Sequence, residues 1–119
     1  MENLAATIHL VTLEQGGGTF DQEGNAPKTG CMVGLAGQGT TIPVHQFSPA
    51  NIEEFIGTFK AKYAGQADMH LGTWVENGVV YLDVAKWLPE QHKEQAVQLA
   101  RETGEKAIFL LSSLETLYV

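Results

Sequence analysis

The sequence predicts one α+β domain over residues 1–119, with an antiparallel-rich sheet and two helices on one face. Three observations support this fold class. An Asn-Gly dipeptide lies between two extended apolar segments, which is the pattern of a β-hairpin with a two-residue turn. Two other segments combine a proline at the expected helix start with apolar residues at helical spacing. The length of 119 residues suits a single domain.

The N-terminal part is expected to form a strand followed by a hairpin. Ala6–Leu13 is rich in Thr, Ile, Val and Leu and has no helix-start signal, so we interpret it as a strand that ends at Gly16-Gly17-Gly18. The turn-forming residues within Thr19–Pro27 predict a hairpin that returns through Gly30–Val33. Both elements would extend the sheet.

A further strand is expected at Thr41–Phe47, after the loop Gly37–Gly39. Ser48-Pro49 then marks a helix start, because the serine oxygen can accept a free backbone N–H and proline fits the first helical position. The helix is predicted from Pro49 to Ala64, and Gly65 ends it. Its apolar residues recur on one face: Ile52, Phe55, Ile56, Phe59 and Tyr63.

Two strands, Met69–Glu76 and Val79–Val84, flank Asn77-Gly78. If these two residues form the turn, Trp74 lies opposite Tyr81 and the side chains of both strands separate onto two faces. The face expected to pack under the helices carries Leu71, Thr73, Val75, Val80, Leu82 and Val84. The opposite face is expected to carry His70, Gly72, Trp74, Glu76, Val79, Tyr81 and Asp83.

The Trp74–Tyr81 pair on that opposite face has two interpretations. The rings are either core residues beneath the N-terminal segment or part of a surface for a partner or ligand. The sequence leaves both open.

The C-terminal part predicts a second helix and one or two strands. Pro89 opens the helix and Gly104 ends it, Ala107–Leu111 is a buried strand, and Thr116–Val119 is expected as an edge strand. From Thr41 onward the order of elements is therefore strand, helix, strand, strand, helix, strand. This is the split βαβ order of ferredoxin-like folds.

The net charge of the chain indicates which classes of partner to expect. Fourteen acidic and seven basic residues give a net charge of −7, spread along the chain. A negative field repels phosphate backbones and anionic lipids, so we expect no direct nucleic-acid binding and no membrane partner. The N-terminus has no basic segment followed by an apolar core, and Cys31 is the single cysteine, so a cytoplasmic location is expected.

No motif in the sequence indicates catalysis, a metal or a cofactor. Cys31 has no CxxC companion, and no ligand spacing joins His9, His45, His70 and His92. His70 and Asp83 could orient one another as a general base pair, but no serine or cysteine nucleophile is tied to them. We therefore expect a protein that is not an enzyme.

Several segments together resemble a known group of proteins. These segments are Gly18–Phe20, Gly24-Asn25, Gly30–Val33, Leu71–Val75, Asn77-Gly78, Val80–Val84 and Ala107–Phe109. Their pattern is similar to that of small uncharacterised α+β proteins encoded by bacterial phages and mobile elements. The resemblance implies a setting in which small acidic proteins act as stoichiometric inhibitors of host defence complexes, as anti-CRISPR proteins do. It names no catalytic residue.

The leading hypothesis is a non-catalytic binding protein whose carboxylates meet a basic surface on a host protein or complex. The candidate partner-binding residues are Asp21, Glu23, Glu53, Glu54, Glu76, Glu90, Trp74 and Tyr81. Two alternatives remain. In one, two sheets pack face to face in a homodimer and enclose a pocket lined by Trp74, Tyr81 and His70 that binds or transforms an apolar small molecule. In the other, the protein is an accessory subunit that docks through its aromatic face.

Overall fold

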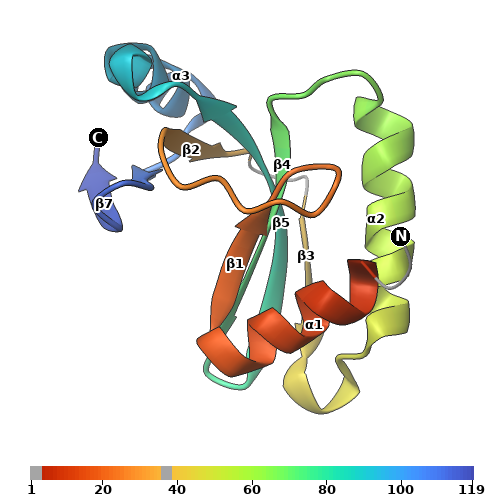
Figure 1. Cartoon of the computed structure of the whole chain (residues 1–119). Coiled ribbons are helices and arrows are strands. Elements are labelled where there is room, and N and C mark those ends of the chain that lie inside the picture. Colours follow the sequence, from red (N-terminus) through yellow and green to blue (C-terminus); the bar gives the residue numbers. More distant parts are fainter. Residues whose placement is uncertain (1–3, 36–38) are drawn as a thin grey trace.

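The computed structural model describes residues 4–35 and 39–119, so part of the predicted loop Gly37–Gly39 lies outside the described residues. Figure 1 shows the arrangement of the elements. In chain order they are α1 (Leu4–Gln15), β1 (Gly17–Phe20), β2 (Cys31–Gly34), β3 (Thr40–Pro43), the 3-10 turn η1 (Val44–Gln46), α2 (Pro49–Tyr63), β4 (Met69–Glu76), β5 (Val79–Leu88), the 3-10 turn η2 (Glu90–His92), α3 (Lys93–Thr103), β6 (Ala107–Leu110) and β7 (Glu115–Tyr118).

The seven strands form one antiparallel sheet, which confirms the α+β class. The strand order is β1-β4-β5-β2-β6-β7, and β3 pairs with β5. The long strand β5 organises the sheet because it has β4 along one side, and β3 and then β2 along the other. The ferredoxin-like order is not confirmed, since β6 pairs with β2 and β3 runs antiparallel to β5.

The central hairpin has the predicted register. Trp74 lies opposite Tyr81 and Gly72 opposite Asp83. Asn77 and Gly78 have φ angles of 54° and 76°, the left-handed values that a tight two-residue turn requires. The strand β5 continues past the predicted end at Val84 to Leu88, where it pairs with β2.

The remaining predicted elements after Thr40 are found with small shifts. Helix α2 starts at Pro49, and the N-cap Ser48 and Asn51 form a reciprocal capping box. Helix α3 ends at Gly104, whose φ of 81° is the left-handed value typical of a helix end. The predicted strand Thr41–Phe47 is shorter, because the chain turns into η1 at Val44.

The prediction of a strand at Ala6–Leu13 is wrong, because this segment is helix α1. Its buried residues Ala5, Ile8 and Thr12 lie on one helical face, but Leu10 and Leu13 are exposed on the other side. Apolar residues thus surround the helix, and the sequence shows no helical period that would outweigh its β-branched residues.

The predicted hairpin between Thr19 and Val33 is also wrong. Strand β1 pairs with β4, and β2 pairs with β5 and β6, so the two strands are not partners. The turn signals are real but local: Asp21 Oδ1 accepts hydrogen bonds from the backbone N–H groups of Glu23 and Asn25. Local turn chemistry does not specify which distant strand each segment joins.

All three helices lie against the same face of the sheet. Val80 and Leu82 of β5 pack with α1 and α2 in one cluster, and Leu88 packs under α3 with Cys31 of β2 and Ala96 of α3. These β5 residues are an even number of positions apart, so they point to one side. The opposite side, here called the open face, has no helix of the described residues over it.

Candidate functional site

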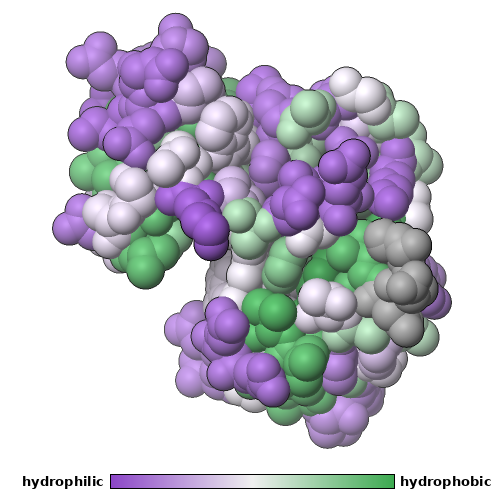
Figure 2. Space-filling model, viewed as in Figure 1, coloured by the Kyte–Doolittle hydropathy of each residue, from purple (hydrophilic) through white to green (hydrophobic). Residues whose placement is uncertain are grey.

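A groove runs along the open face. Its volume is about 1070 Å³, and its lining comes from β1, β4, β5, β2 and β6 and from the residues around β7. Gln15 at the end of α1 and Ala26 and Pro27 of the β1–β2 connection also contribute. Figure 2 shows the surface hollowed between the side that carries α3 and β7 and the side that carries α1. The groove thus lies on the side of the sheet opposite the helices.

The groove exists because the middle of the open face carries small residues. Gly72 pairs with Asp83, and Gly34 pairs with Ala85, in neighbouring rows of the sheet. A Cβ added at Gly72 would have no atom nearer than the backbone oxygen of Gly18, at 4.0 Å. Larger side chains in these rows would fill the space above the strands.

Trp74 lines this groove, and Tyr81, which is not in the lining, stacks against it. Their ring centroids are 4.7 Å apart and their planes differ by 14°, so the rings stack. The indole Nε1, on the edge of the ring, donates a hydrogen bond to Glu76 Oε1 at 3.3 Å. Trp74 lines the groove and is 42% exposed.

The position of α1 decides between the two interpretations of this aromatic pair. Helix α1 packs on the helix-covered face, where Thr12 Oγ1 meets Thr73 Oγ1 at 2.6 Å. Thr73 and Trp74 are adjacent in β4, so their side chains point to opposite faces. The interpretation as core beneath the N-terminal segment is therefore wrong, and Trp74 belongs to an open surface.

Two carboxylates, Asp83 and Glu105, also line the groove. Burial, followed by the nearby negative charge of Glu105, raises the pKa of Asp83 above its ordinary value of 3.8. Glu105 reaches over Gly34, where an added Cβ would lie 3.2 Å from Glu105 Oε1. Among the described lining residues there is no lysine, arginine or histidine, so these carboxylates are not neutralised there.

The predicted acidic residues are only partly brought together. Glu76 joins Trp74 and Tyr81 at the hairpin end. Neither Glu76 nor the other five belong to the groove lining: Asp21 and Glu23 lie in the β1–β2 connection, Glu53 and Glu54 on α2, and Glu90 in η2. Asp21 is already occupied by its own loop.

The two carboxylates of the groove, Asp83 and Glu105, were not among the predicted binding residues. The hairpin register does place Asp83 on the same face as Trp74, so a signal for it was present. Glu105 had no such signal, because it follows α3 and reaches the groove only through the pairing of β6 with β2.

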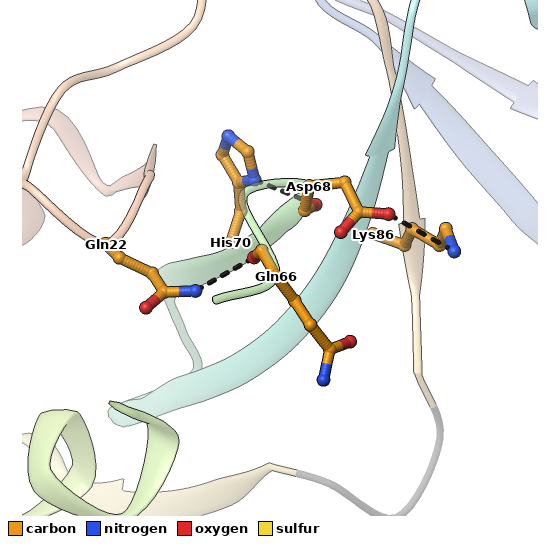
Figure 3. A network of polar contacts seen from close by, with 5 residues as sticks. All are labelled: Gln22, Gln66, Asp68, His70 and Lys86. Carbon is orange, nitrogen blue, oxygen red and sulfur yellow. Dashed lines mark hydrogen bonds and ion pairs between the residues drawn. The ribbon is translucent and has the colours of Figure 1, made fainter. Parts of the chain in front are cut away.

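His70 has a structural role (Figure 3). Its Nδ1 lies 3.0 Å from the backbone oxygen of Asp68 and must carry the proton, because a carbonyl only accepts. The same oxygen accepts the backbone N–H of Trp87 at 2.8 Å, and the Asp68 carboxylate pairs with Lys86 at 3.2 Å. No hydrogen bond joins His70 to Asp83 within the described residues, which gives no support to a general base pair.

Gln22 lies beside this network and donates to the backbone oxygen of Gln66 at 2.9 Å, as Figure 3 shows. It also donates to the backbone oxygen of Tyr63 at 3.0 Å. It ties the β1–β2 connection to the chain between α2 and β4. The pocket expected between Trp74, Tyr81 and His70 differs from the groove found: of these three residues, only Trp74 lines it.

The described residues offer no evident metal centre. Within residues 4–35 and 39–119, no group of three or more His, Cys, Asp or Glu side chains could hold a metal ion. The Cys31 thiol is buried, and burial, with Glu90 adding to it, raises its pKa. None of the helices in the described part of the chain combines the length and apolar character needed to cross a membrane.

Comparisons with known proteins leave the groove to be interpreted from its own chemistry. No protein-family model, curated protein or solved structure matches this chain.

Proposed function

We propose that this protein is a non-catalytic binding protein that holds a basic protein partner in the groove on its open face. In the phage or mobile-element setting that the sequence resemblance implies, the partner is a host defence protein or complex and the action is stoichiometric inhibition. The net charge of −7 would steer a basic partner toward the molecule.

One observation carries this proposal. The groove combines an exposed indole, Trp74, with two carboxylates, Asp83 and Glu105, and its described lining has no positive charge. A cation that enters the groove gains attraction from both carboxylates and displaces no cationic side chain of the described lining. An apolar surface alone would not select for charge.

The same carboxylates argue against the face-to-face homodimer. Two open faces pressed together would bring two copies of Asp83 and Glu105 near one another in a poorly hydrated interface. Burying such unpaired charges is costly. Docking as a subunit of a larger assembly stays compatible with the groove, provided that the neighbouring surface is basic.

The test uses a nonapeptide with two lysines flanking a central arginine and no acidic residue, labelled for fluorescence polarisation. We expect binding that weakens as sodium chloride rises. Asp83→Asn combined with Glu105→Gln should weaken it by about tenfold or more, which corresponds to about 1.4 kcal/mol.

The matched control is Glu53→Gln combined with Glu54→Gln. It removes the same number of charges from exposed positions on α2, away from the groove lining. We expect it to change the affinity by less than about twofold. Equal losses in both double variants would show attraction by net charge without a site, and would overturn the proposal.

A further inference from the structure

We propose that the groove selects an arginine side chain of the partner, with its guanidinium stacked on Trp74 and directed at the carboxylates of Asp83 and Glu105. This inference rests on the proposed function and names the chemical group that the groove takes. It commits to an arginine within a protein chain, and free guanidinium compounds are a separate outcome of the test.

The first step of the argument is the rigid flat wall. Trp74 is stacked on Tyr81 with a centroid separation of 4.7 Å and donates to Glu76 at 3.3 Å. Both contacts hold the indole in place before a ligand arrives, while 42% of the residue stays exposed. A planar guanidinium can stack on such a ring, whereas the ammonium of lysine meets it only as a point charge.

The second step is the hydration of the carboxylates. Asp83 is partly buried, and its raised pKa reflects that burial and the neighbouring Glu105. A cation that pairs with it must lose water as well. Guanidinium is more weakly hydrated than ammonium and offers five N–H donors, enough to serve two carboxylates.

The third step is room for a long side chain. Gly72, paired with Asp83, leaves open space above β4, whereas the Glu105 side chain takes the space above Gly34. The volume of about 1070 Å³ exceeds what one side chain needs. An extended segment of the partner can therefore lie in the groove with one arginine directed at the carboxylates.

The fourth step is that the described lining of the groove holds no lysine, arginine or histidine. The cation nearest to Asp83 in the sequence, Lys86, lies three residues after it on the same strand. Side chains an odd number of positions apart on a strand point to opposite faces. Lys86 is paired with Asp68 at 3.2 Å, so it does not compensate the groove.

The experiment compares four nonapeptides that differ only at the central residue: arginine, lysine, citrulline and alanine. Citrulline keeps the shape of arginine without its charge. With the wild-type protein we expect arginine to bind about tenfold more tightly than citrulline or alanine and about threefold more tightly than lysine.

Two variants assign this preference to the residues named. Trp74→Leu should bring the affinities for the arginine and lysine peptides close together, while both peptides still bind more tightly than the citrulline peptide. Trp74→Phe should keep part of the preference for arginine over lysine. Asp83→Asn with Glu105→Gln should bring arginine close to citrulline. The variants are compared by thermal melting first, and Glu53→Gln with Glu54→Gln again serves as the control.

Each alternative outcome would overturn a different part of the proposal. Equal affinity for the arginine and lysine peptides, with the groove carboxylates still required, would overturn the arginine inference and leave the proposed function standing. Binding of N-acetyl-arginine amide as tight as that of the arginine peptide would overturn the protein-chain occupant. Loss of all dependence on Asp83 and Glu105 would overturn the inference together with the proposed function.

Discussion

Ionisation of the Asp83 carboxyl lowers the stability of the fold but is needed for the proposed binding of a cation. Burial and the charge of Glu105 raise its pKa in the folded protein above the ordinary value of 3.8. The folded state therefore holds a proton on this carboxyl more tightly than the unfolded state does. Its contribution to stability is fully present below the unfolded pKa and is lost as pH rises through the folded pKa.

Asp83→Asn is thus expected to raise the melting temperature at neutral pH, because it removes a partly buried charge that lies beside another one. The gain over wild type should shrink as pH falls toward 3, where the wild-type carboxyl is protonated. Melting curves from pH 3 to 8 measure this. A variant that is less stable than wild type at pH 7 would contradict it.

For the basic peptide the pH dependence has the opposite sign. A cation pairs with the ionised carboxylate, so affinity should rise with pH through the pKa of Asp83 and then level off. Binding should release protons, because the cation lowers that pKa. Isothermal titration in two buffers of different ionisation enthalpy detects the proton release, and Asp83→Asn is expected to abolish most of it.

At the scale of elements, the docking of α1 on β4 depends on a buried pair of hydroxyls. Thr12 Oγ1 donates to the backbone oxygen of Ile8 at 2.7 Å and lies 2.6 Å from Thr73 Oγ1. A hydroxyl has one proton, so Thr73 must be the donor to Thr12. The two partners are therefore not equivalent.

This asymmetry predicts unequal costs of two similar substitutions. Thr73→Val leaves Thr12 still donating to Ile8 and should cost about 1 kcal/mol of unfolding free energy. Thr12→Val leaves the buried Thr73 hydroxyl without its acceptor and should cost more, within about 1–3 kcal/mol. Urea denaturation of the two variants decides the order, and the reverse order would show that the assigned donor is wrong.

Several strands line the groove, and Gly72 of β4 is a position where it can be filled without changing a charge. Gly72→Leu is expected to fold, because an added Cβ meets open space and the residue lies in a regular strand. The leucine side chain should occupy part of the groove and lower the affinity for the basic peptide by about tenfold or more. Gly57→Ala on α2, where an added Cβ also meets nothing within 4 Å, is the control and should leave binding unchanged.

The strongest predictions from the sequence concerned elements whose signals are local. The turn Asn77-Gly78 settled the hairpin register, and Ser48-Pro49 and Gly104 marked helix ends close to those observed. The same kind of reasoning was wrong for α1, whose residues favour strand by composition. That helix is stabilised by packing of Ile8 against the sheet, and no local sequence pattern around Ile8 predicts this contact.

The whole molecule places its helices on one face of the sheet and leaves the other open. Its negative charge is spread along the chain, and the predicted acidic residues of α2 and η2 belong to elements separated in the sequence by β4 and β5. Asp83 of β5 and Glu105, which follows α3, nevertheless line the same groove as Trp74. The charge of the chain favours a basic partner, and the groove supplies a place for it.

The sequence by itself determined the α+β class, the central hairpin and the side of it on which Trp74, Tyr81 and Asp83 lie, because a two-residue turn and the alternation of a strand set these within a few residues. Only the tertiary structure decided that α1 covers the opposite side, that β1 and β2 join different strands, and that Glu105 lines the same groove as Asp83. Those outcomes depend on packing and pairing between segments distant in the chain, and the free energy of such contacts is not written in any local pattern.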